Sequence, residues 1–257
     1  MKIIFMGRKK QSAELLKWTK EQGIEIAYVC TDNQFDNSPT AEQARKMNIP
    51  VISMEEAEEY VNNNPGEIDL VVSYLYWRKI RKPLIDGPKY GCINFHPAIL
   101  PDWKGCGGYN IAILYKLPEW GVTAHYVNED IDTGKIIRVN KFSFDNNSAT
   151  AQSLEKITQD ELVKLYKEIL LEVKEKGKLE TLDVDNSKGT YISRKQMNDM
   201  KEIKLEELND ENLDNKVRAF WFPPYDGAYI EINGKKYTLV DKEILNSLVD
   251  SKTTALF

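Results

Sequence analysis

The first hundred residues alternate short apolar runs with stretches that have the spacing of amphipathic helices, and this alternation restricts the chain to few folds. Five strand-like runs fall at residues 2–6, 24–29, 50–53, 68–74 and 91–96. Helix-like stretches between them fall at residues 12–22, from 39 onward, 54–63 and near 79–86. Such alternation predicts an α/β fold with a Rossmann-like, mostly parallel, doubly wound sheet and helices on both faces.

Local signals place the ends of the first helices. Ser12 is expected to cap the first helix, which would run to Gln22 and stop at Gly23. Ser38 and Pro39 predict the start of another helix, because proline is favoured at the first helical position.

Chemically versatile side chains gather between residues 94 and 134. This window holds both histidines of the chain, His96 and His125, together with Asn94 and Asp132. If residues 91–96 form a strand, Asn94 and His96 point to the same face, because side chains alternate along a strand. An amide and an imidazole would then converge on one small group.

These side chains are suited to catalysing the attack of a nucleophile on a carbonyl carbon. Such attack builds negative charge on oxygen, which the Asn94 amide and a protonated His96 could stabilise. Asp132 would fix the imidazole tautomer and order a water molecule. No serine or cysteine is suitably placed as a nucleophile, and a thiol such as Cys92 beside an apolar run is more often core filler. The nucleophile is therefore expected to be an amine of the substrate, or water.

A multi-part motif carries a family resemblance. It consists of Asn94-x-His96-Pro97-x-x-Leu100-Pro101-x-x-x-Gly105, then Gly121-Val122-Thr123, His125 and Asp132-Thr133-Gly134. The motif resembles that of the folate-dependent formyltransferase family, over roughly residues 1–142. The resemblance implies that Asn94, His96 and Asp132 are catalytic and that 10-formyltetrahydrofolate is the formyl donor.

The same resemblance implies where the pterin ring of the donor binds. Residues 73–80 occupy the corresponding stretch, in which Tyr76, Trp77 and Ile80 are the expected contacts. Backbone near Asp130 and Ile131 would close the other side. Ordinary core packing is an alternative for the aromatic residues.

Two assignments have structural alternatives. His125 could lie near the site or on a solvated strand face, since alternation along residues 123–127 allows both. Asp132 could instead bond its own backbone, as acids do in Asp-Thr-Gly turns.

Composition agrees with a folded enzyme without metal or nucleotide cofactor. The 257 residues are 42% hydrophobic and 29% charged, which disfavours a disordered chain. Neither a signal peptide nor a membrane-length apolar run is present in the sequence, so a cytoplasmic location without membrane association is expected. Three cysteines without Cys-x-x-Cys spacing argue against a disulfide framework or zinc.

Charge and glycine content exclude two further classes of ligand. Thirty-five basic against forty acidic residues give 35 − 40 = −5, which disfavours binding of a large nucleic acid. The turn after the first strand holds a single glycine, Gly7, whereas the NAD fingerprint needs several. No Walker-type phosphate loop is present in the sequence either.

The C-terminal third changes character. Residues 148–176 predict a long amphipathic helix with a buried stripe. Asn233-Gly234 lies between two alternating runs and is a strong signal for a β-hairpin. We expect a catalytic domain over residues 1–180, which includes the long helix, and a small antiparallel β module over residues 181–257.

The acceptor is suggested by a second resemblance. Residues 218–229 are similar to the C-terminal segment of sugar-nucleotide N-formyltransferases. This implies transfer to the amine of a nucleotide-linked amino sugar, with dTDP-4-amino-4,6-dideoxyhexose as the best guess, for surface glycans such as lipopolysaccharide O-antigen. The expected acceptor-binding residues are basic, flexible or aromatic: Arg8, Lys9, Lys10, Gly105, Tyr109, His125 and Trp221.

Other acceptors stay open at this stage. A formyltransferase for methionyl-tRNA would be expected to be longer, with a larger basic C-terminal domain, and one for glycinamide ribonucleotide to lack the hairpin. Water as acceptor would make the protein a formyltetrahydrofolate hydrolase, and a non-catalytic binder is a further alternative. A lone hairpin is marginally stable, so it is expected to pack on the catalytic domain or on a second subunit. The resemblance to sugar formyltransferases implies a homodimer with the C-terminal module at or near its interface.

Overall fold

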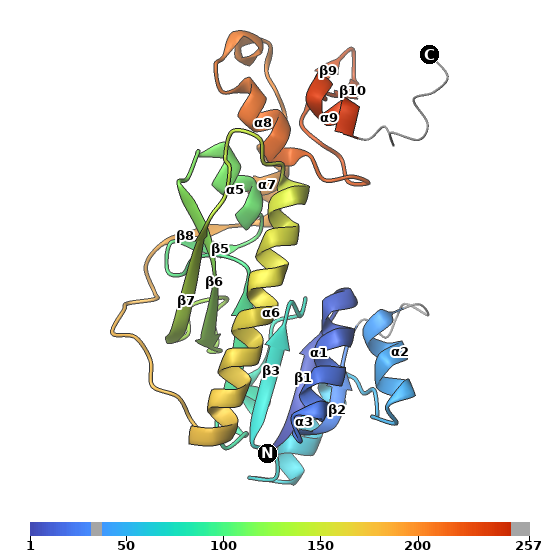
Figure 1. Cartoon of the computed structure of the whole chain (residues 1–257), viewed down its shortest axis with the longest axis vertical. Helices are drawn as coiled ribbons and strands as arrows, with labels where there is room; N and C mark the ends of the chain where they lie inside the picture. The colour runs from blue at the N-terminus through green and yellow to red at the C-terminus, as the bar shows by residue number, and fades with distance from the viewer. Residues whose placement is uncertain (32–37, 248–257) are drawn as a thin grey trace. The chain divides into compact units, whose positions relative to one another are not determined.

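A computed structural model describes residues 1–31 and 38–247 (Figure 1). Among these residues the main sheet has six strands in the order β2-β1-β3-β4-β6-β7. The strands are β1 (Lys2–Gly7), β2 (Glu25–Cys30), β3 (Leu70–Tyr74), β4 (Cys92–His96), β6 (Glu119–Tyr126) and β7 (Ile136–Ser143). The last ten residues of the expected C-terminal module, 248–257, lie outside the described residues.

The direction of the strands changes at one place. β1 pairs in parallel with β2 and β3, and β3 pairs in parallel with β4. β6 then pairs antiparallel with β4, with Asn94 opposite His125 and His96 opposite Thr123. The mostly parallel α/β fold predicted from the sequence is confirmed.

Helices cover both faces of this sheet. On one face, α3 (Met54–Asn63) and α4 (Lys82–Asp86) contribute to an apolar cluster that includes Ile4 and Val71 of the strands. On the other face, α1 (Lys9–Glu21) and the long α6 (Ala151–Lys176) supply Trp18 and Tyr166. The inner strands β1 and β3 are accordingly almost continuous buried runs, as a sheet covered on both faces requires.

Tyr166 is the centre of the second face. Its ring packs edge-on against Phe5 and Tyr74, at centroid distances of 6.2 and 5.9 Å, and lies 5.0 Å from Phe95. Its hydroxyl shares a buried 2.7 Å hydrogen bond with Thr19 of α1. Tyr166 therefore packs α6 against β1, β3 and β4 and also links it to α1.

Several predicted boundaries agree with the structure. α2 (Pro39–Lys46) begins after Ser38, whose hydroxyl accepts the Ala41 amide at 3.3 Å. α3 spans the predicted residues 54–63 and is capped by Ser53 and Glu56. The hairpin forms between β9 (Tyr229–Ile232) and β10 (Lys235–Thr238), with both turn residues, Asn233 and Gly234, at positive φ as a type I′ turn requires.

Two local predictions were wrong. The first helix begins at Lys9 instead of after Ser12, because the Ser12 hydroxyl donates to the Arg8 carbonyl within the first turn. Residues 50–53 form only a single bridge, from Val51 to Val29. Pro50 has no N–H to donate, and Ser53 already caps α3, so too few residues remain for a strand.

The chain divides into two compact units. Of the described residues, the first comprises Met1–Lys104, Gly121–Lys141 and Thr158–Thr190, and the second comprises Gly105–Trp120, Phe142–Ile157 and residues 191–247. The remaining elements of the described chain are short: β5 (Trp103–Gly105), α5 (Gly108–Leu114), β8 (Thr190–Ile192), α7 (Arg194–Asp199), the 3-10 helix η1 (Leu205–Asn209), α8 (Leu213–Phe220) and α9 (Lys242–Ser247). The expected domain division at residue 180 stays a prediction.

Buried Arg218 organises the second unit. Its guanidinium donates to the carbonyls of Asn146 and Ala149, and to the side chains of Asp214 and Asn215. Buried charge is stable only with such complete pairing. Across both described ranges, no helix combines the length and apolarity needed to cross a membrane.

The hydroxyl of Tyr166 offers a test of this packing. Tyr166→Phe leaves Thr19 Oγ1 buried without this partner, so we expect a loss of about 1 to 2 kcal/mol in the free energy of unfolding. Tyr166→Ala should cost about 3 to 5 kcal/mol, because it also opens a cavity. Urea titration measures both values. Tyr225→Phe, at a position that is 71% exposed, is the control, and a Tyr166→Phe protein as stable as wild type would contradict the assignment.

Candidate active site

Three neighbouring strands place polar side chains in one row. Ser73 of β3 lies opposite Asn94 of β4, and Asn94 lies opposite His125 of β6. Ser73 and His125 are buried, and Asn94 is half-buried. Side chains of residues directly opposite each other in paired strands lie on the same face of the sheet. Within β4, the two-residue alternation also places His96 on the face of Asn94, as expected from the sequence.

A chain of hydrogen bonds runs along this row. The His125 Nδ1 lies 2.8 Å from the Tyr126 carbonyl, which can only accept, so Nδ1 carries the proton. Asn94 Oδ1 accepts from the Ser73 hydroxyl at 2.7 Å, so the Asn94 nitrogen, which can only donate, faces His125 Nε2 at 3.1 Å. The amide of Asn94 is therefore oriented, and the second hydrogen on its nitrogen can serve a ligand.

Asp132 lies between the two histidines. Its Oδ2 is 3.5 Å from His96 Nδ1, and its Oδ1 is 3.6 Å from His125 Nε2. In the same turn, Asn128 Oδ1 accepts hydrogen bonds from the Asp130 amide and the Thr133 hydroxyl. The carboxyl group of Asp132 thus lies within 4 Å of one imidazole nitrogen of each histidine.

His96 is held in one tautomer. The residue is 6% exposed, and Nε2 donates to the Trp103 carbonyl at 3.1 Å. Burial lowers the pKa of His96, while the Asp132 carboxylate opposes this and nearby His125 and Lys104 add to it. The ring is accordingly neutral near pH 7, with a free electron pair on the nitrogen that faces Asp132.

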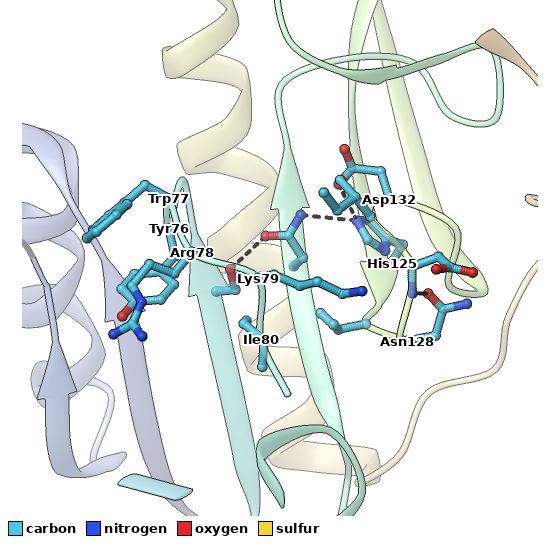
Figure 2. Close-up of a pocket in the computed structure, with 13 residues that line it drawn as sticks. Tyr76, Trp77, Arg78, Lys79, Ile80, His125, Asn128 and Asp132 are labelled. Atoms are coloured by element: carbon cyan, nitrogen blue, oxygen red, sulfur yellow. Dashed lines mark hydrogen bonds and ion pairs between the residues drawn. The ribbon is translucent and has the colours of Figure 1, made fainter. Parts of the chain in front are cut away.

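A pocket opens in front of this row (Figure 2). It has a volume of about 560 Å³, including space open to solvent. Figure 2 shows Tyr76, Trp77 and Ile80 on one side of it, with Asn128 and Asp132 across the row. The lining also contains Ser73, Arg78, Lys79, Asn94, His125, Val127, Asp130 and Ile131.

The structure thus brings together most of the site residues inferred from the sequence. Asn94, His125 and Asp132 share the pocket with all five expected pterin contacts, Tyr76, Trp77, Ile80, Asp130 and Ile131. His96 reaches it through its contact with Asp132. Trp77 and Ile131 are 49% and 47% exposed, so their side chains are accessible to a ligand. Ile80 is 6% exposed and belongs largely to the core.

The basic turn lies beside this pocket without lining it. Arg8 donates through Nε to the carbonyl of Leu75, the residue before Tyr76, at 3.1 Å. Lys9 and Lys10 begin α1 and are exposed. Their expected role in acceptor binding stays a prediction.

Three other expected acceptor contacts belong to the second unit. Gly105 has φ +82°, and a Cβ there would lie 2.5 Å from the Ile192 carbonyl, so glycine is required. Tyr109 is half-buried on α5. Trp221 follows α8, and its carbonyl accepts the Gln152 amide at 3.1 Å. The structure does not place these three in the pocket.

Sequence reasoning missed Ser73 and Asn128 as parts of the site. A hydroxyl at the end of the apolar strand 70–74 was the available signal for Ser73, but its pairing with Asn94 depends on strand register. Cys92 fits its expected core role: it is 1% exposed, and burial raises the pKa of its thiol far above the usual range. Within the described ranges, no cluster of His, Cys, Asp and Glu could hold a metal ion.

Known proteins share this sequence pattern and fold. A family model described as formyl transferase matches residues 1–170. The chain is 29% identical over 253 residues to a methionyl-tRNA formyltransferase of Bacillus cytotoxicus, covering 91% of this chain and 76% of that protein.

Solved structures are similar over nearly the whole chain. A 4-N formyltransferase from Francisella tularensis matches with a TM-score of 0.77 and 22% identity, over 93% of this chain and 96% of that one. An N-formyltransferase from Helicobacter canadensis, solved with folinic acid and dTDP-3-aminofucose, matches with a TM-score of 0.71 and 23% identity, over 92% and 86%. These likenesses establish a common fold.

The contact between His96 and Asp132 yields a prediction about protonation. Because the Asp132 carboxylate raises the pKa of His96, Asp132→Asn should make His96 titrate at a still lower pH than in the wild type. Nitrogen-15 NMR of the imidazoles measures this, and the two histidines of the chain give a simple spectrum. Asp130→Asn, in the same turn, is the control. A rise in the His96 pKa in the Asp132 variant would refute the assignment.

Proposed function

This chain belongs to the formyl transferase family, and on that premise we propose that it transfers a formyl group from 10-formyltetrahydrofolate to the amine of a nucleotide-linked amino sugar. The family membership confirms the resemblance seen in the sequence. One observation carries the proposal: a single pocket joins the Tyr76–Ile80 wall to Asn94, His125 and Asp132. A folate ring and a reactive carbonyl can both be accommodated there.

The lining suits the formyl donor. A pterin needs flat or aliphatic walls and convergent hydrogen-bonding groups, which Trp77, Ile131 and the exposed backbone of the Asn128 turn supply. The solved Helicobacter relative was crystallised with folinic acid, a formylated folate. We extend this kind of ligand to the present chain.

Asn94 is placed to stabilise the charge that forms on the formyl oxygen. Its oxygen and one of its N–H groups are already engaged by Ser73 and His125, so the remaining N–H is oriented before substrate arrives. A preorganised donor of this kind contributes to catalysis because it needs no reorientation as the charge develops.

His96 and Asp132 are placed to move the proton. The attacking amine forms a bond to the formyl carbon and must lose a proton, which the neutral His96 can accept at Nδ1. The Asp132 carboxylate, 3.5 Å away, stabilises the resulting imidazolium. The protonated imidazole then assists the oxyanion and returns the proton to the departing folate nitrogen, which completes the transfer.

Three observations support a nucleotide sugar as acceptor. Two solved structures that each match 93% of this chain are described as a 4-N formyltransferase and a sugar N-formyltransferase. The chain carries a net charge of −5, which is unfavourable for a transfer-RNA substrate. The basic residues 8–10 next to the pocket wall could pair with a diphosphate. dTDP-4-amino-4,6-dideoxyhexose is the first candidate, and the product would serve synthesis of surface glycans.

An acceptor panel tests the proposal. The purified protein is incubated with 10-formyltetrahydrofolate and, separately, amino-sugar nucleotides, glycinamide ribonucleotide, initiator methionyl-tRNA or no acceptor, and products are read by mass. We expect the mass of one formyl group to be added to a nucleotide sugar. Faster reaction with the transfer RNA would reject the acceptor, and formate release without acceptor would identify a hydrolase.

Loss of the Asn94 amide should lower turnover. Asn94→Ala removes the oxyanion donor, so we expect kcat to fall roughly a hundredfold with little change in KM for either substrate. Steady-state kinetics measures this, with Asn62→Ala on the exposed side of α3 as the control. Near-normal turnover in a folded Asn94→Ala protein would rule out this mechanism.

Neutralising the basic turn should weaken binding of the acceptor and leave binding of the folate unchanged. In the Lys9→Ala/Lys10→Ala protein we expect a roughly tenfold or larger increase in KM for the amino-sugar nucleotide, with KM for the folate nearly unchanged. Lys17→Ala/Lys20→Ala removes the same charge further along α1 and is the matched control. An equal increase in KM for both substrates would remove the support that this turn gives to a diphosphate acceptor.

A further inference from the structure

The segment 182–190 follows α6 and is exposed at every residue but one. Leu182 and Val184 are 46% and 45% exposed, whereas the amide residue Asn186 is 4% exposed. This reverses the usual preference of apolar residues for the interior. The burial of Asn186 therefore calls for a specific partner.

That partner is the turn that carries Asp132. Asn186 Nδ2 donates to the Asp132 carbonyl at 3.1 Å and to the Gly134 carbonyl at 2.6 Å. Reversing the amide would set its oxygen against these two acceptors, so the orientation is fixed. Its own Oδ1 is buried without a hydrogen-bond partner among the described residues, which makes the position costly for the fold alone.

The turn needs such support. Asp132 adopts φ +56°, in the left-handed region that disfavours residues with a side chain. At Gly134 a Cβ would lie 1.7 Å from the Tyr126 carbonyl, so the backbone there is packed directly on the end of β6. By binding the carbonyls on both sides of Thr133, Asn186 holds Asp132 in this conformation.

The same segment supports His96 from the other side. The Lys188 carbonyl accepts from the buried ammonium group of Lys104, and the Thr190 amide donates to the Asp102 carbonyl at 2.9 Å. These contacts fix the backbone around Trp103, whose carbonyl accepts from His96 Nε2. One segment thus braces both members of the His96–Asp132 contact.

We propose that Asn186 is a positioning residue that holds Asp132 at its working distance from His96, with segment 182–190 as the brace of the catalytic pair. The segment lies beyond residue 170, where the match to the family model ends. The catalytic meaning of this brace rests on the proposed function, whereas its effect on the His96–Asp132 contact does not. The two can therefore be tested separately.

The decisive variant is Asn186→Leu. Leucine has the same number of side-chain heavy atoms in the same branching and carries no charge, and it removes the two donated hydrogen bonds. The charged or titratable groups facing His96, namely Asp132, His125 and Lys104, all remain. Asn186→Ser keeps one short donor and serves as a second variant that decides the question if the leucine protein does not fold. Ser187→Ala, which removes an exposed hydroxyl that donates to Asp185, is the matched control.

Three measurements are made on each protein. Nitrogen-15 NMR follows the titration of His96, thermal unfolding follows stability, and steady-state kinetics separates kcat from KM. For Asn186→Leu we expect His96 to titrate at lower pH, in the direction given by Asp132→Asn, and kcat to fall about tenfold or more with KM nearly unchanged, because a small misplacement of a reacting group is costly. Asn186→Ser should lie between this variant and the wild type.

The outcomes separate a positioning role from a structural one. A His96 titration identical to wild type in the folded Asn186 variants would overturn the proposal, even if stability or activity falls. A shifted titration in a protein whose wild type transfers no formyl group would uphold the brace and reject the proposed function. Ser187→Ala is expected to match the wild type in all three measurements.

Discussion

The site depends on the place where an antiparallel strand joins an otherwise parallel sheet. Pairing of β6 with β4 sets His125 opposite Asn94, and the parallel neighbour β3 sets Ser73 on the other side of the same amide. A slip of one residue would turn every one of these side chains to the opposite face. The apolar packing around Tyr166 on the far side of the sheet therefore fixes the chemistry as well as the stability.

Burial decides the charge state of the site. His96 is removed from water, which lowers its pKa, while the Asp132 carboxyl group 3.5 Å away opposes this shift. The pair is therefore prepared to receive a proton and to stabilise the cation that results. Backbone carbonyls complete the arrangement: Trp103 and Tyr126 each select one tautomer of a histidine. Such fixed acceptors cost no rearrangement during the reaction.

Periodic features could be predicted from the sequence, and features that depend on long-range contacts could not. The alternation of apolar runs gave the sheet and most helices, and the i, i+2 spacing placed Asn94 and His96 on one face. The hydrogen bond from Ser73 to Asn94 could not be predicted, because it depends on the register between two strands and joins residues twenty-one positions apart. Asn186 acts on a turn fifty-four residues earlier, inside a segment without periodicity. The start of α1 was misplaced because Ser12 bonds backward to Arg8 instead of capping.

The central claim, direct transfer of a formyl group to a sugar amine at this site, can be tested with isotopes. The donor carries carbon-13 in its formyl group, and the amino-sugar nucleotide carries nitrogen-15 at its amine. The account predicts a product whose NMR spectrum shows a one-bond coupling between the two labels. Carbon-13 recovered as free formate, or in a product without that coupling, would contradict it.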